Sequence, residues 1–140
     1  MTSRLRILAG LTGLAALAQS PVPLPTPKSP LPPDLAAAWT AFQAALKADD
    51  AAALAKVARF PLRSNEFGGN LADAAALKRK WTTLFPPATK ACLLAATPQK
   101  TAGARDTFEV FCDVGGYPIR FIFRRAGNAY RFAALDNVNE

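Results

Sequence analysis

The segment TFEVFCDVGGYPIRFIFRRAGNAYRFAALDN, residues 107–137, decides the fold of this chain of 140 residues. It contains two pairs of turn-forming residues, Gly115-Gly116 and Gly127-Asn128, and each pair lies between runs rich in aromatic and β-branched residues. Such pairs are typical of two-residue hairpin turns. The segment therefore predicts three antiparallel strands joined by two tight hairpins.

The two turns also predict which residues lie opposite one another. Residues that face each other lie at equal distances from the turn, and their side chains share one face of the sheet. The predicted pairs are Val114/Tyr117, Cys112/Ile119, Val110/Phe121 and Phe108/Phe123 across the first turn, and Phe123/Phe132, Phe121/Ala134 and Ile119/Asp136 across the second. Because this face is almost wholly apolar, we expect it to cover the core.

The opposite face of the predicted sheet is partly charged. Arg124 and Arg131 face each other there, which is unfavourable unless a negative group lies near them. Glu109, diagonal to Arg124, is one such group; an acidic partner or a homodimer contact is the alternative. The candidate interface residues on this face are Phe111, Arg120, Ile122, Arg124, Arg131 and Leu135.

Two helices are expected at the start of the domain. Apolar residues at helical spacing predict a helix over residues 35–48, and Asp34 precedes it as a helix N-cap. Asp49-Asp50 then interrupts the pattern and can cap a second, shorter helix.

A third helix is predicted over residues 71–85. Asn70, with Asp73 three residues later, is expected to open it, and Pro86-Pro87 ends it. The rest of the chain has the composition of strands.

The N-terminal residues have the pattern of an export signal. Two arginines precede an apolar run that is too short to span a bilayer, and small residues follow it. This pattern predicts a signal peptide, residues 1–18, and places the protein outside the cytoplasm, in a bacterial periplasm. Residues 19–33 are predicted to be a flexible proline-rich arm, since seven prolines lie within residues 21–33. Residues 34–140 remain as a single domain with no membrane span.

The composition excludes several kinds of chemistry. The chain has no histidine, which removes Ser-His and Cys-His nucleophile pairs, His-based zinc sites and the commonest general base. We therefore expect neither a metal nor a cofactor. Seventeen Lys and Arg against ten Asp and Glu give a net charge of +7, but these residues are poorly clustered, so a nucleic-acid partner is not expected.

The chain has only two cysteines, Cys92 and Cys112. Export permits a disulfide between them. A hairpin that turns about Ala102 would place the two cysteines opposite each other, close enough to bridge. We predict a structural crosslink in the sheet, because a metal site lacks further ligands and a redox centre usually has a CxxC motif.

The layout of residues 34–139 resembles the nuclear transport factor 2-like superfamily, in particular its small exported bacterial members. The resemblance implies an α+β fold in which three N-terminal helices pack on a strongly curved antiparallel sheet of about four strands, a cone-shaped roll with a pocket at its open end. The other sheet face often forms a homodimer interface in that superfamily. The stretches that carry the resemblance are AFQAALKADDAAALAKVARFPL (residues 41–62), KWTTLF (residues 80–85) and YRFAALDNV (residues 130–138).

Enzymes of that superfamily usually place an aspartate inside the cone. Asp136 is the only carboxylate that the predicted register puts on the core face. Desolvation in an apolar pocket would raise its pKa and let it accept a proton, with a tyrosine as donor. Alternatively, Asp136 lies at the end of its strand, bound to backbone or water. The pocket candidates are Trp39, Trp81, Tyr117, Phe121, Tyr130 and Asp136.

These patterns favour an exported, non-catalytic binding or accessory domain whose pocket holds a small apolar or amphipathic ligand or a protein partner. Two alternatives stay open. One is an Asp136-dependent lyase or isomerase acting in the same pocket. The other is an inhibitor or accessory protein whose basic sheet face binds an acidic macromolecule.

Overall fold

The computed structural model describes residues 31–139 and shows an α+β fold. The predicted signal peptide and most of the predicted arm lie outside the described residues. The elements are α1 (Pro33–Lys47), α2 (Ala51–Lys56), β1 (Ala58–Ser64), α3 (Ala74–Leu84), α4 (Pro87–Ala95), β2 (Gln99–Lys100), β3 (Thr107–Val114), β4 (Tyr117–Ala126) and β5 (Ala129–Asn137).

The strands form one sheet in the order β1-β5-β4-β3-β2. β1 runs parallel to β5, and the other neighbours are antiparallel. The expectation of an antiparallel sheet of about four strands with three helices is therefore wrong in detail: the described part has five strands in a mixed sheet and four helices. The extra strand is β1, which pairs with the strand farthest from it in sequence, and the extra helix is α4.

The first hairpin is as predicted. Val114 pairs with Tyr117, and the register continues without a break to Thr107 opposite Arg124. Gly115 and Gly116 have φ angles of 64° and 81°, which is the backbone that a type I′ turn requires and that glycine adopts without strain.

The second hairpin is as predicted only near its turn. Phe123 lies opposite Phe132 and Arg124 opposite Arg131, but the register shifts between Ile122 and Phe123. The shift occurs because Ala133 is an extra residue in β5, a bulge, so every later side chain of that strand changes face. The observed pairs beyond it are Ile122/Ala134, Phe121/Leu135, Arg120/Asp136 and Ile119/Asn137.

This bulge overturns two predictions. Leu135, expected on the charged face, is fully buried in the core. Asp136, expected on the core face, lies opposite Arg120, on the face turned away from the helices.

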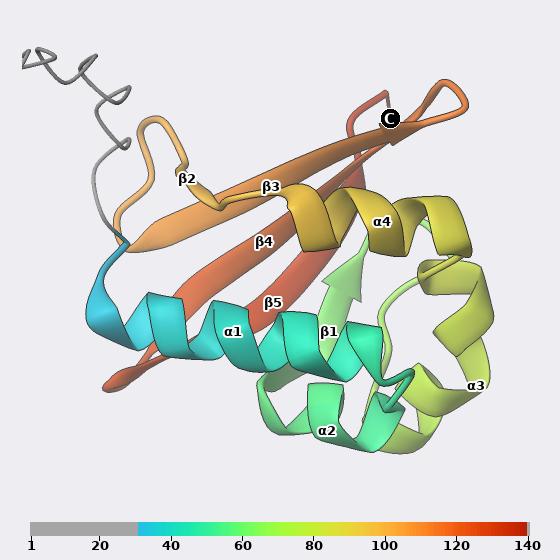
Figure 1. Ribbon diagram of the computed structural model, residues 1–140, viewed down its shortest axis with the longest axis horizontal. Coiled ribbons are helices and arrows are strands. Elements are labelled where there is room, and N and C mark those ends of the chain that lie inside the picture. The colour runs from blue at the N-terminus through green and yellow to red at the C-terminus, as the bar shows by residue number, and fades with distance from the viewer. Residues whose placement is uncertain (1–30, 140) are drawn as a thin grey trace, which may run out of the picture. The chain divides into compact units, whose positions relative to one another are not determined.

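The helices cover one face of the sheet. Figure 1 shows α1 and α4 lying across the same side of the strands, with α2 and α3 next to the C-terminal end of α1. We call this side of the sheet the inner face. The opposite side, which carries Glu109, Phe111, Arg120, Arg124 and Asp136, is called the outer face.

Aromatic rings fill the space between the helices and the inner face. Phe42 of α1 lies 5.1 Å, ring centre to ring centre, from both Phe123 and Phe132, and Phe85 lies 6.0 Å from Phe121. All of these rings are at most 1% exposed. The interior of the domain is therefore a packed core.

Two helices begin where short polar side chains can cap them. Asp50 accepts a hydrogen bond from the Ala53 N–H at 3.0 Å and caps α2, as predicted. Asp73 caps α3 through the Ala76 N–H at 2.9 Å, so this helix begins three residues later than predicted. α1 starts at Pro33 with Pro32 as its N-cap; Asp34, expected to be the cap, lies in the first turn instead.

The main difference from the predicted secondary structure lies in the segment after Pro86. We expected strands there, but α4 begins at Pro87, a first-turn position that suits proline because the missing N–H would have no helical partner. Thr89 and Leu93, four residues apart, form its buried side. Cys92 is therefore on a helix. In place of the predicted hairpin about Ala102, the short strand β2 pairs antiparallel with β3 in another register, with Gln99 opposite Glu109 and Lys100 opposite Phe108.

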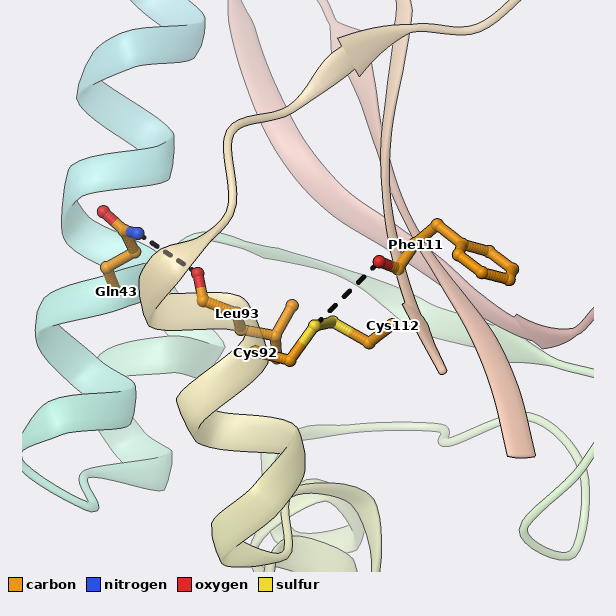
Figure 2. Close-up of a disulfide and its surroundings, with 5 residues drawn as sticks. All are labelled: Gln43, Cys92, Leu93, Phe111 and Cys112. Carbon is orange, nitrogen blue, oxygen red and sulfur yellow. Dashed lines mark hydrogen bonds between the residues drawn. A yellow bond between two sulfur atoms is a disulfide. The ribbon is translucent and has the colours of Figure 1, made fainter. Parts of the chain in front are cut away.

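The predicted disulfide itself is confirmed. Cys92 of α4 and Cys112 of β3 are bridged, with their Cα atoms 6.1 Å apart. In Figure 2 the Cys112 side chain points toward α4, whereas the Phe111 ring points to the other side of β3. Gln43 of α1 also donates a hydrogen bond to the Leu93 carbonyl at 3.2 Å. The bridge therefore fastens a helix to the sheet instead of joining two strands.

Candidate functional site

A hollow of the outer face lies where β1 and β5 separate. Ala58 pairs with Phe132 and Arg63 with Ala134, so residues 59–62 of β1 lie against residue 133 of β5. Four residues of β1 lie opposite a single residue of β5, so they cannot all form the regular hydrogen bonds of a sheet, and β1 bends away from β5 at this point. The gap is not filled from β5, since the residues that face it there are alanines.

We call this space the arginine hollow; its volume is about 610 Å³. Ala133 and Ala134 form its floor. Its rim carries three arginines from two strands, one aspartate and two asparagines. The lining residues are Arg59, Phe60, Pro61, Arg63, Ser64, Asn65, Asn70, Arg124, Ala133, Ala134 and Asp136.

The sheet register places the hollow on the outer face. Arg63 pairs with Ala134, Ala134 with Ile122, and Ile122 with Glu109. Directly paired residues have their side chains on the same side of a sheet. The flanking residues Phe121 and Phe123, which point the other way, are fully buried in the core.

The three arginines of the hollow lack acidic partners within residues 31–139. No carboxylate oxygen in this range lies within 4.0 Å of the side-chain nitrogens of Arg59, Arg63 or Arg124. Glu109, expected to offset Arg124, instead pairs with Arg120 at 3.6 Å. Arg131 donates a hydrogen bond to the Lys56 carbonyl at 2.5 Å. The charge of the hollow is therefore available to a ligand.

Hydrogen bonds hold one wall of the hollow in place. Asn65 accepts from the Asn137 N–H at 2.8 Å and donates to the Asn137 carbonyl at 3.0 Å. Asn70 accepts from the Ser64 N–H at 3.0 Å. The Asn65 bonds tie the segment after β1 to the end of β5, and the Asn70 bond ties the following loop to the end of β1, so the wall is preorganised.

The predicted pocket residues are not gathered in one site. Trp39, Trp81, Phe121 and Tyr130 are between 0% and 9% exposed and belong to the core. Tyr117 is 49% exposed at the tip of the first hairpin. Asp136 alone lines the arginine hollow, on the side of the sheet away from Tyr130, so the predicted Asp–Tyr pair within the cone is wrong.

The predicted interface residues also divide between exposed and buried positions. Phe111 is 55% exposed on the outer face, and Arg120 and Arg131 are half-buried there. Ile122 is on that face but only 5% exposed, and Leu135 is fully buried in the core. Phe111 is therefore the main apolar side chain that the outer face offers to a partner.

Tyr117 borders a second, smaller cavity of about 250 Å³. It lies on the inner side of the sheet, between the first hairpin and the α3–α4 corner. The Tyr117 hydroxyl donates a hydrogen bond to Glu66, next to Phe67 in the lining. The wall is largely apolar and comprises Phe67, Thr83, Leu84, Pro86, Thr89, Cys112, Val114, Tyr117 and Ile119.

A charged cluster at the turn between α1 and α2 has a structural role. Asp49 accepts hydrogen bonds from the Lys90 ammonium at 2.6 Å and the Trp81 indole N–H at 3.2 Å. The hydrogen bond from Lys90 is the largest of the effects that hold the pKa of the Asp49 carboxyl below its ordinary value. Asp49 thereby links this turn to α3 and α4.

Four residues of the hollow were not among the predicted site residues: Arg59, Arg63, Asn65 and Asn70. The period-2 alternation in ARFPLRS, residues 58–64, could have placed Arg59 and Arg63 on one face of a strand. Nothing local indicated that this strand lies beside β5, because that pairing joins residues about 70 positions apart.

No residues in the described part form a cluster that could hold a metal ion, and none of its helices has the length and apolar character needed to cross a bilayer.

No protein-family model matches the chain, and no curated protein matches it at a significant level.

Proposed function

We propose that this protein is an exported, non-catalytic binding domain that holds an anionic ligand in the arginine hollow of its outer face. One observation carries the proposal: Arg59, Arg63 and Arg124 surround a hollow floored by alanine, and no carboxylate of the described chain pairs with them. Arginine is suited to this task, because its planar guanidinium binds carboxylates and phosphates through two parallel hydrogen bonds.

Binding is favoured over catalysis by what surrounds the charged groups. Asp136 has no histidine or tyrosine among the lining residues to share a proton with. It also lies on the half-exposed outer face and not among the apolar side chains of the core. The arrangement supports charge recognition and offers no general acid–base pair.

Titration with inorganic phosphate and with sulfate, followed by NMR at low ionic strength, tests the proposal. We expect shifts for the backbone amides of residues 59–60, 62–65 and 133–136, and binding that weakens as salt is added. Arg63→Gln and Arg124→Gln should each weaken binding about tenfold, which is the effect of one charge-assisted hydrogen bond.

The matched control is Arg79→Gln. Arg79 is exposed on α3 and does not line the hollow, so this variant removes the same charge from another surface. An equal loss of affinity in all three variants would show a general charge effect and would contradict the proposed site.

The resemblance to the nuclear transport factor 2-like superfamily remains part of the proposal. The order of two helices, a strand, further helices and a terminal antiparallel meander supports it. Strong curvature of the sheet into a cone and a position in a bacterial periplasm are likewise proposed; a disulfide between Cys92 and Cys112 is compatible with export.

A second candidate function uses the cavity beside Tyr117. Its largely apolar wall favours a small apolar ligand, or the apolar end of an amphipathic one. Thr83 is exposed at its wall, so Thr83→Trp should block the cavity without disturbing the core. If the variant binds the fluorescent dye anilinonaphthalene sulfonate as well as the unaltered chain does, this candidate fails.

A further inference from the structure

The arginine hollow contains one feature that a simple anion site does not need. Asp136 lines it together with the three arginines. A carboxylate repels an incoming anion, and its removal would strengthen a site whose only task was to attract negative charge. The presence of Asp136 therefore indicates a ligand with more than one kind of polar group.

Asp136 is free to accept a hydrogen bond. Within residues 31–139, no side chain or backbone group donates to its carboxylate, and no Lys or Arg nitrogen lies within 4.0 Å of it. Its cross-strand neighbour Arg120 is engaged by Glu109 at 3.6 Å. Because a carboxylate is an acceptor only, its partner must be an N–H or O–H donor of the ligand.

Charge balance favours a hydroxyl over an ammonium as that donor. Three arginines against one aspartate leave the hollow with a surplus of two positive charges. A doubly charged anion cancels this surplus if its donor is neutral. An ammonium group would leave one positive charge without a counterpart and would itself be repelled by the arginines.

The size of the hollow favours a small molecule over a polymer. Its volume of about 610 Å³ lies in the range of small-molecule sites, roughly 300–1,000 Å³. The wall formed by Asn65 and Asn70 is held by hydrogen bonds to the Asn137 and Ser64 backbone, so it limits the hollow on one side.

We infer that the arginine hollow binds a small hydroxylated dianion: the oxyanion oxygens contact Arg59, Arg63 and Arg124, and a ligand hydroxyl donates to Asp136. A phosphate monoester and a dicarboxylate share this chemistry. The inference rests on the proposed function, since it specifies the ligand of the same site.

Two pairs of probes test the inference by isothermal titration calorimetry. Glycerol 3-phosphate is compared with propyl phosphate, and malate with succinate; within each pair the ligands have the same ionic groups and differ in hydroxyls. We expect the hydroxylated member of at least one pair to bind about tenfold more tightly, the effect of one hydrogen bond to a charged group. The pair that shows the preference identifies the source of the oxyanion.

Asp136 variants should change the ligand preference without weakening the binding of the plain anion, a result that a purely structural role of Asp136 would not produce. Asp136→Ala should abolish the preference for the hydroxylated member while the plain anion binds as tightly as before or more tightly, because a repulsive charge is lost. Asp136→Asn, which keeps the shape of the side chain, should also reduce the preference for the hydroxylated member. This variant replaces the alanine variant in the test if the latter does not fold.

The results separate the inference from the proposed function. Equal affinity within both pairs, or a preference that survives in both Asp136 variants, overturns the inference while the anion site stands. Binding of dextran sulfate without binding of any small probe also overturns it, in favour of an acidic macromolecule. If neither the small probes nor the polymer binds, both the inference and the proposed function fail.

Discussion

Loss of the Cys92–Cys112 bridge should lower the free energy of unfolding by about 3 kcal/mol. The two cysteines are separated by 20 positions in the sequence. In the chain-entropy model, closing a loop of this length removes enough freedom from the unfolded chain to stabilise the fold by about 3 kcal/mol at 25 °C. A domain of this size is stable by only about 5–15 kcal/mol in total, so the bridge supplies a large share.

The perturbation that removes the bridge is the double substitution Cys92→Ala and Cys112→Ala. Cys112 is 1% exposed, and a serine there would bury a hydroxyl without a partner, at an added cost of roughly 1–3 kcal/mol. Alanine avoids that cost. α4 retains the buried Leu93 and the hydrogen bond from Gln43 to the Leu93 carbonyl at 3.2 Å, so the fold should persist.

Urea unfolding followed by circular dichroism measures the effect. With a slope of about 1–3 kcal/mol per molar urea, the midpoint should fall by roughly 1–3 M. A thiol reductant should lower the midpoint of the unaltered chain by a similar amount and leave that of the double variant unchanged.

An unchanged midpoint in the double variant would refute the reasoning. It would mean that the segment between the two cysteines is already ordered in the unfolded chain, or that α4 separates from β3 before the rest of the domain unfolds. Amide hydrogen exchange distinguishes these cases, because early separation predicts fast exchange confined to α4 in both forms.

Three further predictions concern the core, a charged cluster and the outer face. Phe42→Ala should lower the free energy of unfolding by about 3–5 kcal/mol, because Phe42 is fully buried and its ring contacts Phe123 and Phe132; a loss below 1 kcal/mol in urea unfolding would contradict the packed core. Since the folded-state pKa of Asp49 is lowered, its contribution to stability should be present above about pH 4 and be lost as the pH falls through the folded-state pKa. Asp49→Asn should therefore destabilise the domain at pH 6 but not at strongly acid pH. If the difference in unfolding free energy between the variant and the unaltered chain grows as the pH falls, the predicted pH dependence is wrong. If the chain dimerises through its outer face, Phe111→Glu should yield a monomer by light scattering, since Phe111 is 55% exposed there; a monomeric unaltered chain would refute that interface.

Several parts of the fold could be predicted because they depend on neighbours in sequence. Gly115-Gly116 adopts the left-handed backbone of a tight turn, and the complete first hairpin follows from it. Asp50 caps α2 through the N–H of a residue three positions on. The alternation of apolar residues placed Phe121 and Phe123 on the core side correctly.

The candidate site could not be predicted, because it depends on two irregularities that periodicity does not reveal. Ala133 as a bulge residue moves Asp136 to the outer face, and no glycine or turn signal marks that bulge. Arg59 and Arg63 reach the site only because β1 pairs with β5. α4 is not predicted for a different reason: Pro86-Pro87 indicates the end of the preceding helix, but proline is also favoured at the first turn of a new helix.

The sequence by itself determined the two hairpin turns, the cap of α2, the apolar inner face of the sheet and the identity of the disulfide partners. These depend on local backbone preferences, on side-chain alternation and on the presence of only two cysteines. The tertiary structure alone decided that Cys92 crosslinks from a helix, that Leu135 is buried and that Asp136 joins three arginines. Each of these results depends on which distant segments pack together, and such packing is settled by the burial of the whole core.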